Sequence, residues 1–193
     1  MPGIEIAVVY DHDAPRLDRF CAHWGVDAAG SLSEFLAMAP AGGVILNLTN
    51  PGAHYALNRA CLEAGHHVYS EKPLAMDLAE AVDLHGLARA RGLLLVSAPC
   101  SVLGEAAQTL GHALRRGVAG TPRAIYAELD DGFIPQAAHG SWRTESGAPW
   151  PAEDEFRVGC TLEHAGYYLG WLISWFGSVR TVIAASAETV PDK

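Results

Sequence analysis

The fold is decided by the stretch Ala64-Gly65-His66-His67-Val68-Tyr69-Ser70-Glu71-Lys72-Pro73-Leu74-Ala75. This pattern predicts a helix end, a short strand over residues 67–70, and a Glu-Lys-Pro triplet at the carboxyl end of that strand. Ligands of open α/β sheets bind at this edge. An unpaired ammonium group is too costly to bury in a core, and Pro73 restricts Lys72 to extended conformations. We therefore predict that Lys72 is a directed functional cation, with the cis or trans state of its bond to Pro73 left open.

Strand-like and helix-like segments alternate through the first half of the 193-residue chain, which is typical of a parallel sheet with crossover helices. The predicted strands cover residues 4–10, 44–49, 67–70 and 93–97. The predicted helices cover residues 14–24, 32–38 (capped by Ser31 or Ser33) and 53–64, and another begins at Asp77. The apolar period of this last helix places on one side Leu78, Ala81, Val82, Leu84, Leu87 and Ala88.

The pattern changes near residues 99–104. From there the sequence predicts helices over residues 105–116 and 157–176, antiparallel strands over 123–129 and 179–187, and a turn-rich stretch over 130–154. This order is typical of the beginning of a separate α+β domain. We therefore expect two units, residues 1–99 and residues 100–193.

A second motif follows the strand predicted over residues 44–49, where Thr49 and Asn50 precede His54. The ordered set of this motif, the turn at residues 64–68 and the Glu-Lys-Pro-Leu-Ala of residues 71–75 resembles the Gfo/Idh/MocA family of nicotinamide-dependent oxidoreductases. That family is named for glucose-fructose oxidoreductase, inositol dehydrogenase and rhizopine catabolism. The resemblance runs from about Ile4 to Ala185. A lone Glu-Lys-Pro would be a weak signal, whereas the ordered set is specific.

The resemblance implies an α/β fold with an incomplete Rossmann-type parallel sheet. No GxGxxG turn occurs in the sequence, although such a turn normally receives the pyrophosphate. Residues 2–11 match the second strand of the family, so we expect the first, central strand to be absent. Residues 1–99 are then a partial dinucleotide-binding domain, and residues 100–193 a partial substrate or oligomerisation domain. We expect an internal fragment of a dehydrogenase that alone binds nicotinamide dinucleotide poorly.

The resemblance also assigns cofactor contacts, with NAD as the expected cofactor. Asp11 ends the first predicted strand, where an acidic residue binds the ribose hydroxyls and disfavours NADP; His12 beside it leaves NADP open. Asp11 or Asp13 could instead cap the following helix, and Asn-Pro-Gly is by itself a turn signal. The residues expected to line the cofactor are Asp11, Thr49, Asn50, His54, Glu71, Lys72 and Pro73.

The resemblance places Lys72 beside the nicotinamide ring and the reacting oxygen, where its charge can stabilise an alkoxide. Glu71 could hold the amine, or the two could form a solvated surface pair. For proton transfer, Glu163 stands where the family has an aspartate, and Tyr167 stands where it has a histidine. His164 is one step along the same helix. A proton relay by Tyr167 would require a depressed pKa. The alternative is a core face formed by Tyr167, Tyr168, Leu169, Trp171 and Leu172.

Composition narrows the remaining classes. A net charge of -9 without a basic cluster argues against nucleic acid and anionic membranes. No apolar run has the length of a membrane span, and the N-terminus lacks a signal-peptide pattern. Four widely spaced cysteines predict reduced core thiols in a cytoplasmic protein. The adjacent His66 and His67 lack further ligands at metal-site spacing, so we expect no metal.

Two functions compete. The first is an NAD(P)-dependent oxidoreductase that passes a hydride to or from a hydroxyl or carbonyl carbon of a small sugar, cyclitol or related molecule. The second is a non-catalytic fragment or split subunit that acts by pairing with another chain, with strand addition at an exposed sheet edge as the contact. A homo-oligomer or a complementing chain is therefore an expected partner.

Overall fold

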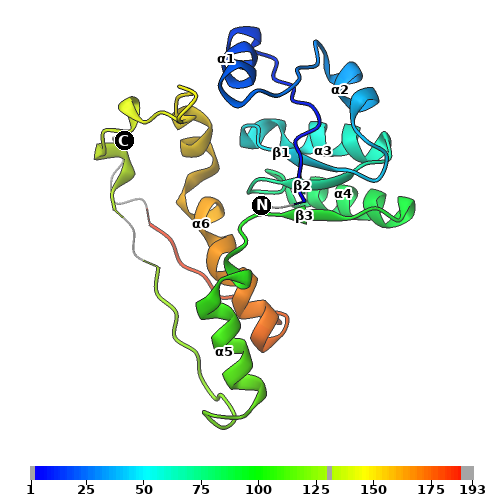
Figure 1. The fold of residues 1–193 in the computed structure, drawn as a ribbon. Coiled ribbons are helices and arrows are strands. Elements are labelled where there is room, and N and C mark those ends of the chain that lie inside the picture. The colour runs from blue at the N-terminus through cyan, green and yellow to red at the C-terminus, as the bar shows by residue number, and fades with distance from the viewer. Residues whose placement is uncertain (1–2, 130–131, 188–193) are drawn as a thin grey trace.

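The computed structural model describes residues 3–129 and 132–187 and has the expected α/β fold (Figure 1). Three parallel strands form its sheet in the order β1-β2-β3: β1 (Val44–Asn47), β2 (His67–Ser70) and β3 (Leu95–Ser97). In their register Leu46 pairs with Tyr69, and Tyr69 pairs with Val96. All three strands therefore end at the same edge, where the Glu-Lys-Pro triplet follows β2.

Two crossover helices cover one face of this sheet, α3 (His54–Glu63) and α4 (Leu78–Arg91) (Figure 1). Asp77 caps α4 by accepting a hydrogen bond from the backbone N–H of Ala79, and Gly92 ends the helix in the left-handed conformation. The buried core between helices and sheet consists of Ile45, Cys61, Leu62, Val68, Leu84 and Ala88. The prediction for α4 was wrong for Leu78 and Val82, which are exposed because they lie off the face that meets α3.

The two helices near the N-terminus have the predicted bounds, α1 (Ala14–Trp24) and α2 (Leu32–Met38). Asp13 caps α1, and Ser31 caps α2 through the backbone N–H of Glu34. The Glu34 carboxylate in turn accepts the backbone N–H of Gly30. These local hydrogen bonds satisfy helix-end donors without tertiary help, which is why the sequence predicts these helix starts.

The strand predicted over residues 4–10 is not formed. The segment makes only an isolated bridge between Val9 and Ala28, and Ile4 and Ile6 are exposed. Among the described residues, no strand lies alongside this segment for the length of a ladder. A strand without a neighbour leaves its backbone groups to water, so the apolar alternation alone does not make it one.

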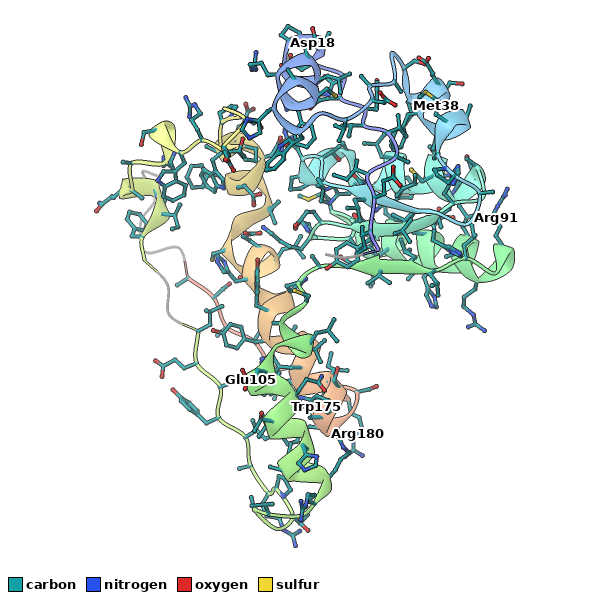
Figure 2. All side chains as sticks on the ribbon, in the orientation of Figure 1. Asp18, Met38, Arg91, Glu105, Trp175 and Arg180 are labelled. Atoms are coloured by element: carbon teal, nitrogen blue, oxygen red, sulfur yellow. The ribbon has the colours of Figure 1, made fainter. Side chains whose placement is uncertain are left out.

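The second half is built around two helices, α5 (Glu105–Arg115) and α6 (Ala152–Phe176), which lie side by side (Figure 1). A Cβ added at Gly111 would lie 2.7 Å from the Trp175 ring, so the glycine lets α5 approach α6 closely (Figure 2). Helix α6 begins five residues before the prediction and bends at Gly159, where φ is 76° and ψ is 154°. Short 3-10 turns complete the chain: η1 (Pro51–Ala53), η2 (Ser101–Leu103), η3 (Ile134–Gln136) and η4 (His139–Ser141).

The antiparallel strands predicted over residues 123–129 and 179–187 are also not formed. Their side chains face solvent, as Tyr126 at 87% and Ile183 at 96% exposure show. Neither segment has a ladder partner within the part of the chain that is described. The physical reason is the one that holds for residues 4–10: a strand is stabilised by its neighbours. The division into two domains therefore stays a proposal.

The composition-based predictions have mixed outcomes. All four cysteines are free, but only Cys61 is buried, and Cys100 and Cys160 are exposed, so the prediction of four core thiols was wrong. Within residues 3–129 and 132–187, no helix combines the length and apolar character needed to cross a membrane.

Candidate active site

The Glu-Lys-Pro segment is anchored to the strands on either side of it. The backbone N–H of Glu71 donates to the Asn47 carbonyl of β1 at 2.8 Å. The backbone N–H of Ala98 donates to the Ser70 carbonyl at 2.9 Å. The bond between Lys72 and Pro73 is cis. The two hydrogen bonds hold the backbone that carries Lys72 at the carboxyl edge of the sheet, where an α/β fold places its ligands.

A buried histidine joins the two loops at this edge. The His54 ring is fully buried, with Nδ1 2.6 Å from the Pro73 carbonyl oxygen and Nε2 2.8 Å from the Thr49 carbonyl oxygen. Each ring nitrogen is thus within hydrogen-bonding distance of the backbone of a different loop. Its position makes His54 a brace between the loop after β1 and the loop after β2, beneath the surface rather than on it.

A buried amide network lies beside this brace. The Asn58 side chain accepts from the Asn47 amide at 2.8 Å and donates to the Ser70 hydroxyl at 3.0 Å. The Thr49 hydroxyl donates to the Asn47 side-chain oxygen at 2.7 Å. Helix α3 is thus bonded to the last residues of β1 and β2. Sequence reasoning missed Asn47 and Asn58, although polar residues at a strand end and in a buried helix face were a signal.

Lys72 lies between two carboxylates of α6. Its ammonium nitrogen is hydrogen-bonded to Glu163 and lies 3.4 Å from Oε2 of Glu155. The three side chains are 15%, 19% and 13% exposed, respectively. Burial acts to lower the pKa of Lys72, but the hydrogen bond to Glu163 and the charges of both glutamates outweigh it and raise this pKa. Lys72 is therefore a stable cation in a partly desolvated place.

Glu155 was not among the predicted site residues. Burial raises its pKa first, and the negative charge of Glu163 adds to that effect, while the charge of Lys72 opposes it. It lies before the bend in α6, four residues from Gly159 and eight from Glu163. Its only sequence signal was a run of acidic residues near a predicted helix start, which is more often a solvated first turn.

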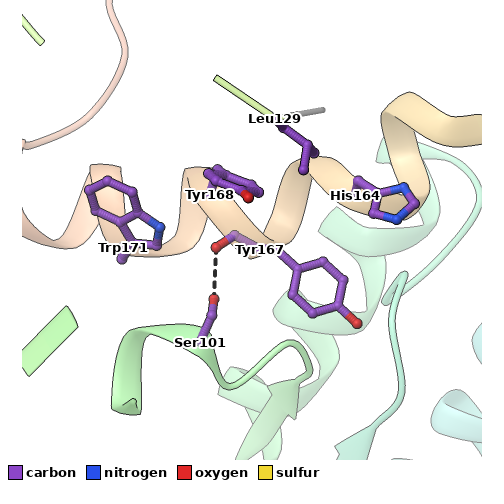
Figure 3. Close-up of a pocket in the computed structure, with 6 residues that line it drawn as sticks. All are labelled: Ser101, Leu129, His164, Tyr167, Tyr168 and Trp171. Atoms are coloured by element: carbon purple, nitrogen blue, oxygen red, sulfur yellow. Dashed lines mark hydrogen bonds between the residues drawn. The ribbon is translucent and has the colours of Figure 1, made fainter. Parts of the chain in front are cut away.

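Tyr167 and His164 line one pocket with a volume of about 420 Å³, together with Ser101, Leu129, Tyr168 and Trp171 (Figure 3). The Tyr167 carbonyl accepts the Ser101 hydroxyl at 2.8 Å, which joins α6 to η2. The Tyr167 phenol is near the lysine charge, but burial outweighs that charge and raises its pKa. The depressed pKa that a proton relay by Tyr167 would require is therefore not found, and the phenol stays protonated at neutral pH.

The remaining predicted residues are held by their own neighbours. Asp11 accepts the backbone N–H of Asp13 at 2.9 Å and lies 3.6 Å from Arg16, at the start of α1. Of the two candidates for the cap of α1, the structure has Asp13. The Asn50 amide donates to Asp154 of α6 at 2.6 Å. The Glu71 carboxylate accepts the backbone N–H of Lys72 rather than its ammonium.

Similarity to known proteins shows the family of this chain. Residues 1–98, just over half of the chain, match the GFO_IDH_MocA family, described as "Oxidoreductase family, NAD-binding Rossmann fold". The chain belongs to this family. Its Rossmann-type sheet edge, with the Glu-Lys-Pro motif after β2, is therefore that of an NAD-binding oxidoreductase fold.

Several family members are similar in sequence. The UDP-N-acetylglucosamine 3-dehydrogenase of Acidithiobacillus ferrooxidans is 30% identical over 133 residues, which cover 69% of this chain and 40% of that protein. The trans-1,2-dihydrobenzene-1,2-diol dehydrogenase of Macaca fascicularis is 30% identical over 146 residues, which cover 75% of this chain and 43% of that protein. The chain therefore spans less than half the length of these curated relatives.

A solved structure extends the comparison to bound molecules. KijD10, a 3-ketoreductase from Actinomadura kijaniata in complex with TDP-benzene and NADP, is 26% identical with a TM-score of 0.53. The match covers 61% of this chain and 37% of KijD10. The cofactor class of the Gfo/Idh/MocA family, a nicotinamide dinucleotide, is thus seen in a structural neighbour of this chain.

Proposed function

We propose that the protein is an NAD(P)-dependent oxidoreductase that acts on a hydroxyl or carbonyl carbon of a sugar, a cyclitol or a related small molecule. The observation that carries the proposal is the position of Lys72, a partly buried cation fixed at the carboxyl edge of the sheet and facing Glu163 of α6. A loop edge with a directed cation suits a nicotinamide site, and the neighbouring residues proposed to border the cofactor are Asp11, Thr49, Asn50, His54, Glu71 and Pro73.

Lys72 supplies positive charge where an oxygen becomes negative. A bound nicotinamide would supply or accept the hydride. As hydride adds to a carbonyl carbon, the electron pair of the C=O bond moves to oxygen, and a fixed ammonium group stabilises that oxygen. The raised pKa of Lys72 keeps it cationic across the neutral range. The charge is already in place before reaction, so no reorganisation is needed when the oxygen becomes negative.

Tyr167 is the proposed proton donor in the direction of reduction. The phenol holds its proton at neutral pH, and because an alkoxide is a much stronger base than a phenolate, donation to the developing alkoxide is favourable even with the pKa raised. His164 is the alternative donor, because its ring borders the same pocket. The Nδ1 atom of this ring lies 3.2 Å from the Cys160 carbonyl oxygen. Glu163 is proposed to hold Lys72 rather than to transfer the proton.

The pocket beside Tyr167 favours a ring-bearing substrate. Four of its lining side chains are aromatic: His164, Tyr167, Tyr168 and Trp171. Flat rings bind the apolar faces of sugars and cyclitols, while hydroxyl groups at their edge reach polar side chains. Relatives whose names specify nucleotide-sugar and dihydrodiol substrates support this class.

The test is a steady-state assay of NADH and NADPH oxidation with a panel of keto-sugars and inosose-type ketones. Replacing Lys72 with Ala should lower kcat by about a hundredfold or more, and Tyr167→Phe should lower it by about a hundredfold. Tyr126→Phe is the control: it removes a hydroxyl from an exposed residue that does not line the pocket, and it should leave kcat unchanged. An unchanged kcat in Lys72→Ala would remove this lysine from the mechanism.

A second candidate function is that of a subunit which acts only when paired with another chain. Among the described residues, β1 pairs with β2 alone, and Val44 and Leu46 expose their side chains on the face opposite α3. Sheets of parallel strands are usually covered on both faces, so this apolar face favours a partner. Sedimentation velocity of the purified chain, combined with an assay of NADH turnover on the same sample, distinguishes the two candidates. A monomer with full NADH turnover excludes the second.

A further inference from the structure

We propose that Glu155 is a positioning residue for Lys72, a second carboxylate that holds the ammonium in place together with Glu163. The bend of α6 at Gly159 brings the two carboxylates to the same nitrogen. The inference rests on the proposed role of Lys72 and extends it to a residue outside the motif that contains Glu163 and Tyr167.

The geometry of α6 makes this arrangement specific. Glu155 and Glu163 are eight residues apart, which in an unbroken helix is about 12 Å along the axis and about 80° around it. At Gly159 the backbone leaves the helical region, with φ 76° and ψ 154°, a conformation that only glycine adopts readily. Because the helix changes direction there, carboxylates from both of its parts reach the Lys72 nitrogen.

A neighbouring contact fixes the same part of α6 to the sheet edge. Asp154, next to Glu155, accepts the Asn50 amide at 2.6 Å, and Asn50 lies in the loop after β1. The first turns of α6 are thus held by one loop through Asp154 and by the next loop through Glu155. A solvated surface pair would not be held in this way, and the low exposure of Glu155 agrees with a constrained side chain.

The charges around the lysine explain what the second carboxylate adds. The titratable groups near it are Glu71, Glu155, Glu163 and Tyr167. Burial of Lys72 acts to lower its pKa, and the hydrogen bonds and charges of both Glu163 and Glu155 act to raise it. With two ion pairs to α6, the lysine remains cationic and cannot move away without breaking both of them. Its role is then that of a fixed charge, not of a base.

The experiment uses a property of the sequence, which contains only two lysines, Lys72 and Lys193. Competitive labelling with acetic anhydride between about pH 8 and pH 12, followed by peptide mass spectrometry, gives the pH midpoint of Lys72 reactivity. In Glu155→Gln, which keeps the shape of the side chain, we expect this midpoint to fall by about one pH unit. At pH values below both midpoints, Lys72 of the Glu155→Gln variant would then react about tenfold faster than Lys72 of the wild-type protein.

Glu153→Gln is the matched control, because it removes the same charge from an exposed residue of the same helix turn. It should leave the midpoint of Lys72 unchanged. Gly159→Ala is a second, independent variant: it disfavours the bend and should lower the midpoint as Glu155→Gln does. A change in access alone would alter the limiting rate but not the midpoint.

Equal midpoints in the wild-type protein and in Glu155→Gln would overturn the proposal. If Glu155→Gln does not fold, as judged by circular dichroism, an unchanged midpoint in Gly159→Ala overturns it instead. The labelling needs no cofactor or substrate, so it separates this inference from the proposed function. A shifted midpoint without any NADH turnover would support the positioning role of Glu155 and reject the activity of the chain on its own. Turnover with an unshifted midpoint would reject the positioning role and leave the activity standing.

Discussion

The strand β2 and the segment of residues 123–129 are similar as sequences and different as structures. Each contains a β-branched residue followed by a tyrosine, Val68-Tyr69 in β2 and Ile125-Tyr126 in the other segment, and both are predicted to be strands. β2 lies between β1 and β3, with Val68 buried against α3 and α4. Residues 123–129 have no ladder partner among the described residues, and Tyr126 lies in solvent.

The difference shows what a strand requires beyond its own pattern. Within β2 each backbone N–H and C=O can find a partner on one side or the other, and one face is covered by helices. An isolated extended segment has neither hydrogen-bond partners nor a covered face, so it gains nothing to offset the loss of chain entropy. The same amino-acid pattern therefore gives a buried strand in one place and exposed chain in another.

The largest expected effect comes from emptying the core under the paired strands. Leu84 of α4 is fully buried, so Leu84→Ala removes packed methyl groups and leaves a cavity, at a cost of about 3 kcal/mol in unfolding free energy. Leu78→Ala, an equal change on the exposed side of the same helix, should cost less than about 0.5 kcal/mol. Urea unfolding followed by circular dichroism measures both; equal losses would mean that α4 does not cover the sheet as described.

The next effect tests the polar contacts of the paired region. Asn58→Ala leaves the Asn47 amide and the Ser70 hydroxyl buried without their partner, which should cost about 2 kcal/mol. Tyr55 lies in α3, as Asn58 does, and its hydroxyl donates an exposed hydrogen bond to Asp83 of α4. Tyr55→Phe removes this hydrogen bond and should cost less than about 0.5 kcal/mol. The same urea experiment compares them, and a cost for Asn58→Ala as small as the control would show that water replaces the amide.

The helices and the paired strands were predictable because their signals are local. Asp13, Ser31 and Asp77 cap their helices with side-chain bonds to residues two or three positions ahead. The apolar runs at β1 and β2 are short, and each is separated from the next by a complete helix, which is the sequence order of a parallel sheet. The unpaired segments were not predictable, because the presence of a neighbouring strand is a property of the whole fold.

The candidate site likewise contains some features that the sequence predicts and others that it does not. Lys72 was predictable because a lysine before a proline at a strand end has few structural uses, and its closeness to Glu163 followed from the family motif. Glu155 was not predictable, because its approach to Lys72 depends on the direction that the chain takes at Gly159. The raised pKa of Tyr167 was not predictable either, because the burial that causes it is set by the tertiary structure.

The smallest expected effect is at the unpaired segments and is the sharpest test of the comparison. Ile125→Thr and Ile183→Thr replace exposed side chains outside any ladder and should each change the unfolding free energy by less than about 0.5 kcal/mol. Ile45→Thr makes the same change in β1, where the side chain is buried, and should cost about 2 kcal/mol because it places a hydroxyl in the core. If Ile125→Thr or Ile183→Thr were as costly as Ile45→Thr, the side chain would have to be buried against another part of the protein or a second chain. The concentration dependence of the urea midpoint separates these two explanations, because only contact between chains makes stability depend on protein concentration.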